Sequence, residues 1–331
     1  MFGTAQARQR AEVFGELAAM VRAGVSIGES LTTVAGDMRP SRMQRALMKV
    51  GHEVSGGQAL GESLERHPGA FSDLTIAMVQ VGERGGRLED ALRNVADYFE
   101  RDFELRGLLR RELTYPLILL GAILFIPLVA NMIVVWIRDS VAAALVAGAG
   151  QLGIYALVFG VPLGAGYLVV RRMRQSRLGR EKIDRIKLSI PLIGTVLRKL
   201  ALARFCRALA SLYSAGVLMG TALRLAGQAS GNAVVNRELG GGAKTVEGGG
   251  SLSDALSGSS LMPGTVLTML KTGERTGDVD AMAHNVAGHL EQEARTSVKQ
   301  MAVSITPVVV IIAGIIVLVM ALSFYTNLYS F

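Results

Sequence analysis

The amino-acid sequence contains the same pattern twice. Residues 17–31 match residues 209–223 at a constant spacing of 192 positions, and both stretches contain the pattern Gly-Val-x-x-Gly-x-x-Leu. A second pattern, Gly-Glu-Arg-x-Gly, also occurs twice, and each copy is followed by a long apolar segment with a proline, Pro116 and Pro307. Because repeated sequence indicates repeated structure, we predict two copies of one unit, a polar domain that leads into a membrane helix.

Three parts of the chain are long, apolar and without charged side chains: residues 113–137, 140–170 and 301–331. Each is longer than the roughly 20 residues that a helix needs to cross about 30 Å of hydrocarbon. Half of all residues are hydrophobic and the mean hydropathy is +0.38, which is too apolar for an ordinary soluble protein. We therefore predict three transmembrane helices, at residues 113–137, 151–170 and 301–327, with residues 138–150 as a short periplasmic linker.

The polar parts of the sequence are predicted to be helical. One helix face carries Phe14, Leu17, Ala18 and Val21, and similar patterns recur in both copies, whereas no segment alternates with a period of two. The fold class is therefore all-α: two homologous cytoplasmic six-helix bundles plus three transmembrane helices. The bundles occupy residues 1–112 and 201–300, and residues 171–200 form a basic cytoplasmic linker.

The weakest helical signal lies in the second copy. Six glycines fall within residues 232–251. Each lowers helix propensity by about 1 kcal/mol relative to alanine. We expect a mobile loop there, and we expect a turn from Pro191 to Gly194 where the basic linker enters the second domain.

Basic residues flank the first two spans. Arg106, Arg110 and Arg111 precede the first, and six basic residues between positions 171 and 182 follow the second. Because such clusters stay on the cytoplasmic side, both polar domains are predicted to be cytoplasmic and the C-terminus periplasmic. Residues 1–22 lack the uninterrupted apolar core of a secretory signal. Attraction to anionic lipid, about 1 kcal/mol per basic residue near the surface, explains the net charge of +8 without a nucleic-acid partner.

Patterns that suggest nucleotide or metal binding lack the structural context that such binding requires. The glycines of residues 148–153 satisfy G-x-G-x-x-G but follow no strand, so close packing of membrane helices explains them better than a nucleotide. Residues 242–245 resemble the end of a P-loop but lack its glycines. The four histidines form no H-E-x-x-H, and a single cysteine, Cys206, gives no zinc cluster. We predict no catalytic residue, no cofactor and no metal.

The duplicated Gly-Glu-Arg-x-Gly pattern remains, and two interpretations stay open. In the structural one, the glycines form a turn, the glutamates accept backbone N–H bonds at the start of the following helix, and the arginines lie in solvent. In the functional one, both turns form a charged docking surface for another protein. The candidate partner-docking residues are Gly82, Glu83, Arg84, Gly86, Gly273, Glu274, Arg275 and Gly277.

Together, the paired patterns and the prolines inside the first and third spans resemble the type II secretion system protein F family, which includes the inner-membrane platform protein of type IV pilus assembly. The resemblance implies a bacterial inner-membrane platform without catalysis of its own, coupling a cytoplasmic ATPase to assembly of pilin or pseudopilin subunits. It also implies other inner-membrane assembly proteins as partners, and a homo-oligomer. A continuous helix from Leu88 to Ile137 would transmit the motor's movement to the membrane.

Two departures from the family pattern matter. Many members have an additional N-terminal segment, whereas the first repeat here starts within about ten residues of Met1, so contacts attributed to that segment cannot be assumed. Thr276 and Asp278 replace Gly85 and Arg87, so the two turns are expected to bind different surfaces. The alternatives are a small multi-pass transporter or channel, a membrane-bound enzyme, and an unrelated receptor or adaptor. Secretion, pilus assembly and DNA uptake all remain possible settings.

Overall fold

The computed structural model describes residues 2–138, 140–173, 177–191 and 193–329, and the regular elements within them are all helices. This confirms the all-α class for the described residues. The chain divides into two compact units. The first unit combines Met1–Leu108 with Leu188–Thr296, and the second combines Leu109–Lys187 with Ser297–Phe331. The two polar repeats therefore lie in one unit and the apolar segments in the other.

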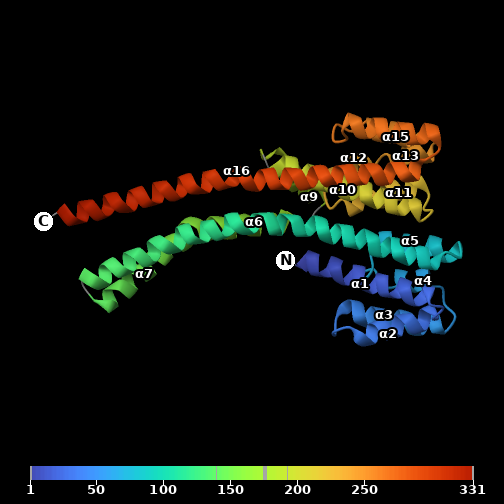
Figure 1. Ribbon diagram of the computed structural model, residues 1–331, viewed down its shortest axis with the longest axis horizontal. Coiled ribbons are helices and arrows are strands. Elements are labelled where there is room, and N and C mark those ends of the chain that lie inside the picture. Colours follow the sequence, from blue (N-terminus) through green and yellow to red (C-terminus); the bar gives the residue numbers. More distant parts are fainter. Residues whose placement is uncertain (1, 139, 174–176, 192, 330–331) are drawn as a thin grey trace. The chain divides into compact units, whose positions relative to one another are not determined.

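The first repeat (residues 2–108) is a set of short helices between two longer ones, labelled in Figure 1. They are α1 (Phe2–Arg22), α2 (Ile27–Asp37), α3 (Arg42–Ser55), α4 (Leu60–Glu65), α5 (Asp73–Arg84) and the start of α6 (Leu88–Arg138). The side chains of Ser26, Ser41 and Ser72 cap α2, α3 and α5 by accepting a backbone N–H three residues later. Gly24, with a φ of +85°, follows the end of α1. Phe14 is fully buried at the centre of this repeat.

The second repeat (residues 193–296) has a similar order of helices, with two short helices where the first repeat has α3 alone. Its helices are α10 (Ile193–Ser214), α11 (Met219–Ala229), α12 (Ala233–Gly240), α13 (Ala243–Glu247), α14 (Leu252–Ser257), α15 (Gly264–Thr276) and the start of α16 (Val279–Tyr329). The basic linker expected at residues 171–200 contains α9 (Arg177–Ser189), and the turn expected at Pro191 separates α9 from α10.

The loop expected at residues 232–251 is wrong, because this segment contains α12 and α13. Asn232 caps α12 by accepting the N–H groups of the next helical residues. The glycines are needed for packing and turning here. A Cβ at Gly242 would lie 2.7 Å from the carbonyl oxygen of Ala255, and Gly249 has a φ of +88°. Tertiary packing thus outweighs the low helix propensity of glycine.

The second unit contains the apolar ends of α6 and α16 together with α7 (Val141–Tyr155), a π-helix (Ala156–Gly160) and α8 (Val161–Met173). Among the described residues, two helical segments are long and apolar enough to cross a membrane, within Leu117–Ile137 and Val279–Leu318. The linker expected at residues 138–150 is mostly helical, since α7 begins at Val141.

The glycine pattern of residues 148–153 lies on α7, with no strand before it. A Cβ at Gly148 would lie 2.8 Å from the sulfur of Met132 on α6, so this glycine permits close helix packing. The side-chain amide of Asn131 donates to that of Gln151 over 3.0 Å, which joins the same two helices. Helix packing therefore accounts for these residues.

Candidate partner-docking site

The first Gly-Glu-Arg-x-Gly turn connects α5 to α6. The N–H of Gly86 donates to the carbonyl of Glu83 over 3.2 Å, and the N–H of Arg87 donates to the carbonyl of Gly82 over 2.8 Å. Gly86 has a φ of +67°, a conformation that favours glycine. A Cβ at Gly82 would lie only 2.2 Å from the Cβ of Ala91, so α5 and α6 approach each other closely at this point.

The Glu83 carboxylate caps a third helix. Its two oxygens accept the N–H groups of Leu60 and Gly61, at 2.6 and 2.9 Å, at the start of α4. Hydrogen bonds to a charged acceptor contribute about 1.5–3 kcal/mol, and a negative charge suits a helix N-terminus. The main role of Glu83 that the geometry supports is therefore to hold α4 against α5.

The second turn, between α15 and α16, repeats this arrangement. The Glu274 carboxylate accepts the N–H of Leu252, and it also accepts the N–H and hydroxyl of Ser253 at 3.2 and 2.6 Å, at the start of α14. A Cβ at Gly273 would lie 2.7 Å from the Cβ of Met282, and Gly277 has a φ of +77°.

The structural interpretation of the glutamates is correct in kind but wrong about the helix. The sequence predicted bonds to the following helices, α6 and α16, whereas Glu83 and Glu274 cap the preceding helices, α4 and α14. Side chains on a helix lean toward its N-terminus. A glutamate in the last turn of α5 or α15 therefore leans away from the next helix and reaches the one packed beside its own.

The two arginines of the pattern are exposed. Arg84 and Arg275 lie in the last turns of α5 and α15, and within residues 2–138, 140–173, 177–191 and 193–329 neither has an ion-pair or hydrogen-bond partner. The eight candidate residues therefore fall into two groups with different surroundings. The glycines and glutamates hold the turn, and the guanidinium groups are the part of it that a partner could contact.

The two turns have different neighbours. Beside the first, a Cβ at Gly216 in the second repeat would lie 3.3 Å from the Cγ1 of Val81 and 3.7 Å from a guanidinium nitrogen of Arg87. In the second turn, Asp278 accepts the N–H of Ala281 at the start of α16. The sequence differences between the turns therefore fall where their surroundings differ.

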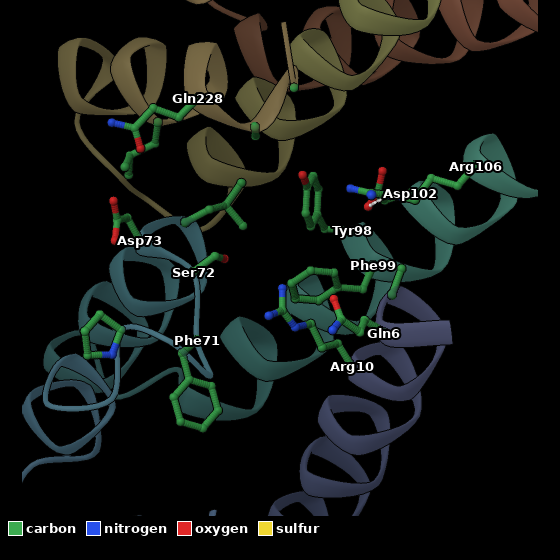
Figure 2. A pocket seen from close by; sticks show the side chains of 16 residues that line it. Gln6, Arg10, Phe71, Ser72, Asp73, Tyr98, Phe99, Asp102, Arg106 and Gln228 are labelled. Carbon is green, nitrogen blue, oxygen red and sulfur yellow. Dashed lines mark hydrogen bonds and ion pairs between the residues drawn. The ribbon is translucent and has the colours of Figure 1, made fainter. Parts of the chain in front are cut away.

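A buried ionic cluster joins the two repeats. Asp102 on α6 is 4% exposed, and one carboxylate oxygen accepts the Nε–H of Arg106 over 2.6 Å. Its other oxygen lies 3.4 Å from the Nε of Arg204 on α10. Burial is the main cause of the lowered pKa of Arg204, and it also raises the pKa of Tyr98 nearby. Figure 2 shows Tyr98, Asp102 and Arg106 along α6 at this cluster.

The cluster borders a cavity of about 390 Å³ between the repeats. Arg10 on α1 lies on its wall, where its guanidinium donates to the carbonyl of Ala70 over 3.0 Å and lies 5.2 Å from the ring centre of Phe99 (Figure 2). Desolvation, followed by the charge of Arg106, lowers the pKa of Arg10. Both contacts lie within the first repeat, and they offset part of the cost of burying the Arg10 guanidinium.

A second ion pair crosses between the repeats. The guanidinium of Arg295 on α16 donates to the carboxylate of Glu104 on α6 over 2.6 Å. These residues lie 191 positions apart, as Asn94 and Asn285 do, so they occupy equivalent positions of the two repeats.

Comparison with known proteins agrees with the duplicated architecture. The family model described as "Type II secretion system (T2SS), protein F" matches the chain twice, over residues 14–135 and 205–326, which together make up more than half of the chain. The chain belongs to the type II secretion system protein F family. The two matched segments coincide with the two sequence copies, and each includes a polar repeat and the apolar helix that follows it.

Relatives within the protein F family include proteins of both pilus assembly and secretion. The chain is 31% identical to the type IV pilus assembly protein PilC of Thermus thermophilus over 91% of this chain and 77% of the relative. It is 31% identical to the type II secretion system protein F of Pseudomonas aeruginosa over 96% of this chain and 81% of the relative. It is 29% identical to the type IV pilus assembly protein TapC of Aeromonas hydrophila over 95% and 79%. The protein F family consists of inner-membrane components of these machines and is not a known family of enzymes.

The ion pairs between the two repeats of this protein F family member were not predicted from its sequence. Arg204 is one of four basic residues in the first helix of the second repeat, so the local sequence does not single it out. Nothing in the sequence pairs this arginine with Asp102, since the two residues are about a hundred positions apart and belong to different repeats.

Proposed function

We propose that this chain is the inner-membrane platform of a type II secretion or type IV pilus assembly machine, which couples a cytoplasmic ATPase to assembly of pilin or pseudopilin subunits. The observation that carries the proposal is the double family match across both repeats, together with similar relatives named for both systems. In this proposal both repeats are cytoplasmic helical bundles, three helices span the membrane, and the C-terminus is periplasmic.

The proposed docking surface consists of the two exposed guanidinium groups of Arg84 and Arg275. Arginine forms bidentate hydrogen bonds with carboxylates, so acidic side chains of a partner are suitable ligands. The turns that carry these arginines are held on both sides, by the capping glutamate and by the close contact with the next helix. A force applied at the turn would therefore reach the next helix directly.

The proposed relay is α6. It extends without interruption from Leu88 to Arg138, so it is helical from the first turn through the first predicted span. The Asp102 and Glu104 ion pairs attach α6 to the second repeat, so movement of one repeat would be passed to the other.

Charge reversal of the arginines tests the docking proposal. In cells that depend on this chain, Arg84→Glu and Arg275→Glu should reduce co-purification of the ATPase and reduce pilus or secretion output. Arg39→Glu is the matched control, because Arg39 is also exposed and the change in charge is the same. If both variants retain normal ATPase association and output while folded and inserted, the docking surface is wrong.

A further inference from the structure

The first and last helices of the second repeat are joined by a buried ion pair. Arg207 on α10 donates two parallel hydrogen bonds to Glu291 on α16, at 2.6 and 2.9 Å. The side chains are 14% and 9% exposed. The planar guanidinium matches the carboxylate, and this bidentate geometry is the strongest form of such a pair. An arginine of the chain itself therefore lies between α10 and α16 and bridges them.

The equivalent positions of the first repeat carry only half of this pair. Glu100 on α6 lies at the position of Glu291, at the same spacing as Asn94 and Asn285. Gly15 on α1 lies at the position of Arg207, at the spacing of Leu17 and Leu209. The carboxylate is thus present in both repeats, while the arginine is replaced by glycine in the first.

Nothing in the local structure requires glycine at position 15. A Cβ there would be 4.0 Å from the Cβ of Ala96, which is an ordinary contact, and Gly15 is not among the glycines with positive φ. Glycine is also one of the least favourable residues inside a helix. Its effect here is to leave the space open that a side chain would otherwise occupy.

A groove of about 680 Å³ occupies that space between α1 and α6. Ala11, Gly15 and Ala19 line its α1 side at intervals of four residues, so they form a continuous small-residue surface along one helix face. Arg8, Glu12 and Arg22 of α1 border this row, so another helix would approach α1 most closely at Gly15.

Three arginines and three carboxylates line the groove, but two of the carboxylates are unpaired within the described residues. The three arginines at its rim are engaged with other carboxylates, as Arg8 with Glu12, Arg22 with Glu89, and Arg93 with Glu89. Glu100 and Asp97, which also line the groove, are exposed and have no ion-pair or hydrogen-bond partner in the part of the chain that the structure describes. The groove therefore offers two unpaired carboxylates beside an uncovered helix surface.

We infer that the groove between α1 and α6 receives a helix of a different protein, which inserts one arginine toward Glu100. The inserted side chain reproduces, between two proteins, the pair that Arg207 and Glu291 form within the second repeat. Arginine fits better than lysine, because its fork can bond both carboxylate oxygens. This interface is separate from the exposed arginines proposed to dock the motor, and the inference holds whether or not that docking is correct.

Photo-crosslinking in native membranes tests the inference with the full chain. A photoreactive benzoylphenylalanine at Glu16, which is exposed and next to Gly15 but outside the groove lining, should crosslink to one protein. Gly15→Arg places the missing arginine in the chain itself, and it should reduce that crosslink at least tenfold. Gly15→Ala is the matched control and should reduce it less than twofold, because a methyl group leaves the groove open.

A charge exchange identifies the inserted residue. Glu100→Arg should also remove the crosslink, and changing the arginine found in the crosslinked peptide to glutamate should restore it. Since Glu100 is exposed and unpaired, this variant remains informative if Gly15→Arg does not fold. A crosslink that persists in folded Gly15→Arg and Glu100→Arg overturns the inference. Crosslinks to lipid, to a second copy of this chain, or to a segment without a basic residue overturn it as well.

Discussion

Replacing Asp102 with alanine should strongly destabilise the unit that contains both repeats. Asp102 lies on α6, and its carboxylate faces the guanidinium of Arg204. The substitution leaves this guanidinium, whose side chain is 20% exposed, without its counter-ion. Breaking a buried pair by removing one partner costs about 3–5 kcal/mol.

The structure places this variant near the lower end of that range. The contact between Asp102 and Arg204 is 3.4 Å long and lacks hydrogen-bond geometry, so its loss costs less than the loss of a close pair. Arg106 loses its bond as well, but its side chain is 37% exposed and can turn to water, which limits its contribution to about 1 kcal/mol or less. We expect about 3 kcal/mol, equivalent to about 6–12 °C in melting temperature for a unit of about 200 residues.

The assay is the thermal unfolding of the full chain in detergent, followed by circular dichroism. Asp97→Ala is the matched control, because Asp97 is an exposed and unpaired aspartate on the same helix, and it should change stability by less than about 0.5 kcal/mol. The double variant Asp102→Ala, Arg204→Met removes the stranded charge and should recover part of the loss. A melting temperature of Asp102→Ala within 2 °C of the parent, or a double variant no more stable than the single one, would refute the reasoning.

Three further outcomes are expected. Glu274→Ala should destabilise the second repeat by about 2 kcal/mol, measured as a lower urea midpoint, because the N–H groups at the start of α14 lose a charged acceptor. Gly82→Ala should cost about 1–3 kcal/mol, since its methyl group would meet Ala91, whereas Gly15→Ala should stabilise by about 1 kcal/mol; melting curves with the opposite order would contradict this. Burial raises the pKa of the Cys206 thiol to about 12, so at pH 8 maleimide should label it only after unfolding, as mass spectrometry would show.

Local signals account for what the sequence predicted correctly. The apolar row of Phe14, Leu17, Ala18 and Val21 predicts the helix that is α1, because a helix face is encoded within a few residues. The repeat then extends this prediction to the second half of the chain.

Contacts over long sequence distances account for what the sequence could not predict. The glycine-rich segment around Gly242 is helical because Gly242 packs against Ala255 and Gly240 packs against Gly227, which no local propensity reveals. Glu83 caps a helix that begins 23 positions earlier, and its partner follows only from the packing of α4 on α5. The docking role of the turns remains a prediction. Because Arg84 is the exposed charged side chain of the first Gly-Glu-Arg-x-Gly turn, it is the residue whose mutation tests this role there.

The bond between Glu104 and Arg295 joins equivalent positions of the two halves. If two identical half-length chains associated in the same way, each would place the same amino acid there, and like charges would face each other. Covalent fusion removes this constraint, because each half can then mutate independently and acquire an opposite charge. A single chain with two diverged halves can thus form an asymmetric interface between those halves, which a symmetric pair of identical subunits could not form.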